Sequence, residues 1–107
     1  MSDLSIKPHP TLKDLQEYVA KAVKERGFDT DTVEQRFMLL LEEAGEFAKA
    51  ARNHAGMKFA EDTKTKELAD EAGDVLNVLL GICNMLEIDL EQAYRDKEAI
   101  NQKRTWK

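Results

Sequence analysis

The sequence contains few of the residues on which several large classes of protein depend. Its 107 residues include one cysteine and two prolines, and only 7% of them are aromatic. A lone cysteine cannot form a disulfide within one chain, which favours a reducing, intracellular environment. No stretch reaches the roughly 18 apolar residues of a membrane-spanning helix, and the N-terminus lacks the pattern of a secretion signal. We therefore expect a cytoplasmic protein with no membrane partner.

The charge of the chain limits its partners further. Charged residues make up 35% of the sequence and the formal net charge is -5, which argues against nucleic acid as the primary partner. A nucleotide ligand remains compatible, because a bound metal ion or a local group of lysines and arginines can reverse the sign of the potential. The length suits a single domain that comprises residues 1–107.

Apolar residues recur at helical spacing in four stretches, and no stretch alternates as a strand would. Thr11 is the expected N-cap of the first helix, Gly27 ends it, and DLEQ at Asp89 resembles a capping box. The segment KFAEDTKTK, residues 58–66, is the only sizeable loop expected. We predict an all-α four-helix bundle with helices from Thr11 to Gly27, from Asp31 or Thr32 to Asn53, from Thr65 to Leu86, and from Asp89 to about Arg104.

The stretch VLNVLLGICNML, residues 75–86, is apolar on nearly every side of its helix. One small bundle offers too few neighbours to cover such a helix completely. We therefore expect a homo-oligomer with this helix in the interface.

Three glutamates interrupt the apolar segment LLLEEAGEFAKAAR, residues 39–52. Each residue advances about 100° around a helix, so Glu43 falls within the apolar arc, Glu46 lies about 60° to its side, and Glu42 lies further out. An isolated buried carboxylate is too costly to be incidental. It must be protonated, paired with a cationic side chain, or bound to a metal ion.

A second set of acids follows on the next helix, with Glu67, Asp70, Glu71 and Asp74 at positions i, i+3, i+4 and i+7. Glu71 is the innermost of them. Carboxylates without histidine or cysteine suit Mg²⁺, Mn²⁺ or Ca²⁺ and speak against zinc and di-iron sites. A solvated face is the plain alternative for Glu67 and Asp70, and for Glu42 on the preceding helix.

The last helix carries the opposite charge on its inner side. Lys97, Asn101 and Arg104, at i, i+4 and i+7, continue the apolar stripe of that helix with polar groups. Carboxylates that hold a metal together with cations that hold the remaining charge describe a site for a metal-bound polyanion. The alternative is an internal network of salt bridges that joins the inward acids to Lys97 and Arg104.

The two acidic motifs and the basic tail together resemble a known family. EEAGE at Glu42 to Glu46, EAGD at Glu71 to Asp74 with DVL at its end, and a K-x-x-x-N-x-x-R tail are typical of the MazG-like, all-α nucleoside triphosphate pyrophosphohydrolases. The likeness extends from the first helix to Arg104. A rival register of the second motif, Glu67 to Asp70, lacks the inward angle and the trailing DVL.

The resemblance implies a homodimer or homotetramer that hydrolyses a (deoxy)nucleoside triphosphate to a monophosphate and pyrophosphate, with Mg²⁺ or Mn²⁺, as nucleotide-pool housecleaning. The implied metal ligands are Glu43, Glu46, Glu71 and Asp74, and the implied phosphate contacts are Lys97, Asn101 and Arg104.

The three glutamates of the first motif are the candidate catalytic acids. Either Glu43 or Glu46 would accept the proton of the attacking water, and Glu42 would support them through water or Lys97. A non-catalytic interaction or nucleotide-sensing module, in which the acids are structural, is the alternative function. Trp106 has no assigned role.

Overall fold

The computed structural model describes residues 4–56 and 61–104. These residues form four helices and no strand, which confirms the all-α prediction. The helices are α1 (Leu12–Glu25), α2 (Val33–Gly56), α3 (Glu61–Met85) and α4 (Leu90–Gln102).

The predicted helix ends have their physical basis in local hydrogen bonds. Thr11 caps α1 by accepting a bond from the Asp14 backbone N–H at 3.0 Å, and the Asp14 carboxylate accepts one from the Thr11 N–H at 3.0 Å. Gly27 ends this helix with a φ of 80°, a left-handed conformation that favours glycine. Asp89 caps α4 by accepting from the Gln92 N–H at 3.1 Å. The Thr11 cap, the N-cap position of Asp89 and the glycine stop are confirmed. The capping box expected at Asp89 is incomplete, because the Gln92 side chain donates to Asp96 at 2.8 Å.

The predicted loop at residues 58–66 is wrong in most of its length, because α3 already begins at Glu61 and α2 continues to Gly56. The segment contains no glycine or proline that would stop a helix. The remainder of that loop, residues 58–60, lies outside the described residues, as does Trp106.

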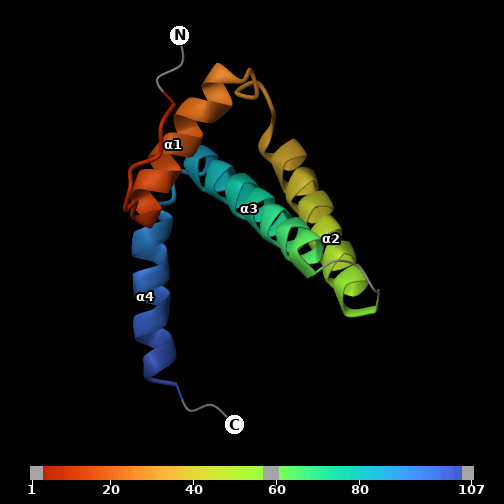
Figure 1. Cartoon of the computed structure of the whole chain (residues 1–107). Coiled ribbons are helices and arrows are strands. Elements are labelled where there is room, and N and C mark those ends of the chain that lie inside the picture. The colour runs from red at the N-terminus through yellow and green to blue at the C-terminus, as the bar shows by residue number, and fades with distance from the viewer. Residues whose placement is uncertain (1–3, 57–60, 105–107) are drawn as a thin grey trace.

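The helices form an open arrangement (Figure 1). Helices α2 and α3 run antiparallel and make the most extensive pairing, while α1 packs across the end of α3. Helix α4 packs against α1 and leads away from the α2–α3 pair. The core lies where α1, α2 and α3 meet, and its buried apolar residues are Val19, Ala22, Ala50, Val78, Leu80, Ile82 and Cys83.

Much apolar surface remains uncovered in the single chain. Its accessible area is 8323 Å², whereas a folded monomer of 12.2 kDa has about 6,000 Å² by the usual scaling with mass. Within residues 75–86 the chain itself buries Val78, Leu80, Ile82 and Cys83, whereas Leu76, Met85 and Leu86 are exposed. The expected place of this helix in an oligomer interface stays a prediction. Exposed apolar residues elsewhere include Phe37, Met38 and Leu41 on α2 and Tyr94 and Ile100 on α4.

Within residues 4–56 and 61–104, every helix falls short of the length and apolar character that crossing a bilayer requires.

Candidate functional site

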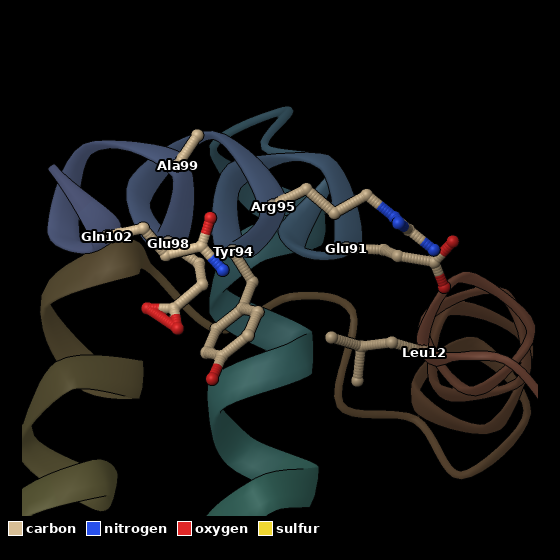
Figure 2. A pocket seen from close by; sticks show the side chains of 7 residues that line it. All are labelled: Leu12, Glu91, Tyr94, Arg95, Glu98, Ala99 and Gln102. Atoms are coloured by element: carbon tan, nitrogen blue, oxygen red, sulfur yellow. The ribbon is translucent and has the colours of Figure 1, made fainter.

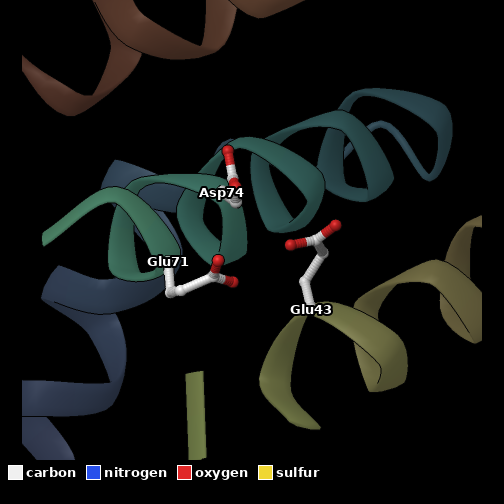
Figure 3. Close-up of side chains that lie close together, drawn as sticks. All are labelled: Glu43, Glu71 and Asp74. Atoms are coloured by element: carbon white, nitrogen blue, oxygen red, sulfur yellow. The ribbon is translucent and has the colours of Figure 1, made fainter. Parts of the chain in front are cut away.

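Three carboxylates from two helices meet between α2 and α3. Glu43 comes from α2, and Glu71 and Asp74 come from consecutive turns of α3 (Figure 3). One carboxylate oxygen from each residue lies within 4.8 Å of the others. The antiparallel pairing of α2 and α3 therefore joins the two acidic motifs of the sequence in one cluster.

The charges in this cluster oppose one another. Burial raises the pKa of Glu43, and the neighbouring charges of Asp74, Glu46 and Glu42 raise it further. Burial likewise raises the pKa of Glu71, with added repulsion from Glu43, Asp74, Glu46 and Glu67. A salt-bridge network would lower these pKa values instead. Burial and repulsion among the acids therefore dominate the electrostatics of Glu43 and Glu71.

The donor atoms of the cluster fit a hard divalent cation. The Oε2 atom of Glu71 is buried and accepts no hydrogen bond from a described group. A buried carboxylate oxygen without a partner is costly, and a cation between the three acids would remove that cost. All three donors are carboxylate oxygens, which Mg²⁺ and Mn²⁺ prefer over the softer metals.

The other predicted acids lie around this cluster without joining its closest group. Glu46 is exposed and near enough to raise the pKa of both Glu43 and Glu71, but it is not one of the three residues within 4.8 Å. Glu42 is exposed on the outer side. Asp70 forms a surface ion pair with Lys66 at 3.2 Å, and this solvated position is the plain alternative that the sequence allowed.

A cavity of about 270 Å³ opens beside the cluster. Glu43 and Asp74 form one part of its wall, and the connection between α1 and α2 forms another. That connection contributes Phe28 and Asp31, so the wall includes an aromatic face and a carboxylate. The other lining residues are Ala22, Val23, Arg26, Arg36, Leu39, Asn77 and Val78. The cavity thus combines an acidic end with guanidinium, amide and aromatic groups, which suits a polar, partly aromatic ligand.

The predicted phosphate-binding residues lie on a different arm of the chain. Lys97 and Asn101 belong to α4, and Arg104 follows its C-terminal end. Helix α4 diverges from the α2–α3 pair (Figure 1), and none of these three residues lines the cavity beside the acids. The structure therefore brings together the acids of the two motifs but does not bring the basic tail to them within one chain.

A larger groove of about 510 Å³ lies between the start of α1 and one side of α4 (Figure 2). Glu91 and Glu98 line it, so two carboxylates face any ligand there, and it lies away from the acidic cluster. Its lining residues are Leu12, Glu91, Tyr94, Arg95, Glu98, Ala99 and Gln102.

Part of the cavity wall lies outside the two acidic motifs and was not predicted from the sequence. Arg36 precedes Glu43 by seven residues, which places the two about 20° apart on one face of α2. Asn77 follows Asp74 by three residues and so shares its side of α3. This spacing was a usable signal for both residues. Phe28 and Asp31 stand in a connection without periodicity, and no pattern marks them.

Comparisons with known proteins show the family of the chain. Residues 9–101 match the model of a family described as phosphoribosyl-ATP pyrophosphohydrolase. The chain is also similar to the uncharacterized protein YpjD of Bacillus subtilis (strain 168). The two are 36% identical over 88 residues, which is 78% of this chain and 77% of YpjD. Both acidic motifs lie within the matched range.

Proposed function

Because the chain belongs to the phosphoribosyl-ATP pyrophosphohydrolase family, within the MazG-like superfamily that its motifs resemble, we propose that it hydrolyses a nucleoside triphosphate to a monophosphate and pyrophosphate. The observation that carries this proposal is the cluster of Glu43, Glu71 and Asp74 beside a cavity with aromatic and guanidinium groups. The role in nucleotide-pool housecleaning follows from the resemblance.

The proposed metal ligands are Glu43, Glu71 and Asp74, with Glu46 as the fourth candidate. When bound, Mg²⁺ would neutralise phosphate charge and lower the pKa of a coordinated water. The three clustered carboxylates would fix the position of the cation, since they project from two packed helices.

Glu46 is the proposed acceptor of the proton from the attacking water. It lies at the edge of the cluster and outside its closest group of three, so its carboxylate can reach a water that the ligands do not hold. Glu43 is the alternative acceptor, and Glu42 supports the site from outside. The bond that breaks is the phosphoanhydride between the α- and β-phosphates, and pyrophosphate leaves.

We propose that the basic residues of α4 complete the site of a second copy of the chain. Lys97, Asn101 and Arg104 diverge from the acids of their own chain, and an oligomer would allow them to contact the phosphates at a neighbouring cluster. The excess accessible surface of about 2,000 Å² supports such an assembly, because an obligate dimer buries 2,000–5,000 Å² in total. A homodimer, or a homotetramer made from dimers, meets this requirement.

The test of the activity is a substrate panel that includes the common deoxy- and ribonucleoside triphosphates and phosphoribosyl-ATP. Pyrophosphate and monophosphate are measured separately, with Mg²⁺, with Mn²⁺ and with EDTA. We expect equal amounts of both products, loss of activity in EDTA, and loss of activity in Glu71→Gln. Hydrolysis in ¹⁸O-labelled water shows which phosphorus is attacked, because the label enters the product that contains it.

The panel also defines what would refute the proposal. A folded protein that is inert towards every nucleotide with both metals would favour the alternative, a non-catalytic module in which the acids are structural. The raised pKa values of Glu43 and Glu71 argue against that alternative, because acids that stabilise a fold have cationic or hydrogen-bonding partners.

A further inference from the structure

Arg36 is a buried cationic residue next to the candidate site. Its exposed fraction is 6%, although arginine is seldom buried without a partner. Its Nη2 donates to the backbone carbonyl of Phe28 at 2.6 Å, and its Nε lies 3.3 Å from Oδ2 of Asp31. The guanidinium of Arg36 on α2 therefore contacts both Phe28 and Asp31 in the connection between α1 and α2.

The same guanidinium also reaches α3. A Cβ on Gly81 would lie 3.5 Å from Nη1 of Arg36, which is an ordinary van der Waals distance, so the guanidinium lies beside α3 at this glycine. Arg36 thus stands between α2, α3 and the connection that carries Phe28 and Asp31. Nη2 donates a hydrogen bond, whereas Nε makes none to a described residue and attracts Asp31 through charge alone. The single amine of a lysine is a point charge and does not present two separate nitrogens to these two partners.

The connection has open space on both of its sides near this point. The cavity beside the acids lies on one side, and a second cavity of about 210 Å³ lies on the other. Phe28, Asp31 and Arg36 line both of them. Backbone hydrogen bonds from the Phe28 N–H to the Val23 carbonyl at 2.9 Å and from the Asp31 N–H to the Phe28 carbonyl at 3.4 Å shape the Phe28–Asp31 turn. The contacts with Arg36 connect this turn to α2.

We infer that Arg36 is a positioning residue for substrate binding: it fixes the Phe28–Asp31 wall of the cavity opposite Glu43 and Asp74. This inference rests on the proposed function, because the ligand of the cavity is the nucleotide. Arg36 acts through the wall and not on the metal ligands. Its loss therefore weakens substrate binding and leaves the acidic cluster able to bind a divalent cation.

The experiment compares Arg36→Lys with the wild type and with Arg52→Lys, an exposed arginine on the same helix that serves as matched control. KM and kcat are measured on the best nucleotide of the panel, Mn²⁺ affinity by titration calorimetry, and Tm by circular dichroism. We expect Arg36→Lys to raise KM about tenfold, with kcat and Mn²⁺ affinity within about twofold of the wild type. Arg52→Lys should match the wild type in every measurement.

Asp31→Asn provides a second variant in case Arg36→Lys does not fold. It removes the charge of the ion pair at a partly exposed position and keeps the shape of the side chain. We expect a smaller rise in KM, again without a change in Mn²⁺ affinity. A fall in Tm with unchanged KM in the folded variants would overturn the inference alone. A wild type that is inert towards the whole panel would overturn the proposed function, and the inference with it.

Discussion

Gln16 offers a quantitative test of how α4 is held. Its side chain is buried, with an exposed fraction of 7%. The amide Nε2 donates to the carbonyl of Ile88, and Oε1 accepts from the backbone N–H of Leu90 at 3.1 Å. Asn84 donates in turn to the backbone carbonyl of Gln16 at 2.9 Å. One amide on α1 therefore satisfies both backbone groups that frame the start of α4.

Gln16→Ala removes both side-chain bonds and leaves a carbonyl and an N–H without their partner. Each such group costs about 1–3 kcal/mol when it is buried. Ile88 and Leu90 are partly accessible, so water compensates in part and the lower end applies. We expect the free energy of unfolding to fall by about 2–3 kcal/mol and Tm to fall by roughly 10 °C for a chain of this size.

The measurement is urea unfolding followed by circular dichroism at 222 nm, with all variants at one chain concentration. Glu17→Ala is the matched control, because the neighbouring side chain is exposed on the same helix. It should lie within about 0.5 kcal/mol of the wild type. If Gln16→Ala unfolds within that margin too, Gln16 does not hold the start of α4 and the reasoning fails.

Three further predictions concern the cluster, the assembly and the first helix. In EDTA, Glu71→Gln should melt at the same temperature as the wild type or at a higher one, because it removes one repelling carboxylate. Saturating Mg²⁺ should raise the Tm of the wild type but not that of the variant. A lower Tm of the variant in EDTA would contradict the metal-site interpretation. Glu71→Gln and Arg104→Ala should each be inactive alone, but mixed dimers refolded from equal amounts should recover about a quarter of wild-type activity, because half the dimers then contain one intact site. No recovery would mean that acids and bases act within one chain. The bond from the Thr11 N–H, and then Lys7, lower the pKa of Asp14 below its usual 3.8, so its contribution to stability is present above that value and is lost as the pH falls through the folded-state pKa. Urea titrations below pH 4 should therefore show a steeper loss of stability in the wild type than in Asp14→Asn, and equal slopes would refute this assignment.

The parts of the fold that follow from local chemistry could be predicted from the sequence. Thr11, Gly27 and Asp89 set helix ends through hydrogen bonds and φ preferences that depend on near neighbours, and all three are confirmed. The start of α3 was missed because KFAEDTKTK is polar, and polarity predicts solvent exposure better than it predicts a loop.

The part of the candidate site that lies on single helices could also be predicted from the sequence. Glu43 and Glu71 were placed by angular arithmetic on single helices, and the antiparallel pairing of α2 and α3 then joins them. The direction of α4 could not be obtained in this way, because it is set by the contacts of Gln16 with residues more than 70 positions away. The Phe28–Asp31 wall was missed for a different reason: its contacts with Arg36 are close in sequence but lie in a connection that has no periodic pattern.

The uncovered apolar side chains of α2 and α4 have a consequence for the stability of this protein at low concentration. If a second copy covers them, folding and assembly form a single equilibrium whose position depends on the number of chains present. Dilution then dissociates the dimer. Dissociation exposes Phe37 and Met38 to water and also removes the cationic side chains that the second copy supplies to the acids. Such an enzyme would lose activity faster than in proportion to its concentration, so a cell could switch it off by making less of it.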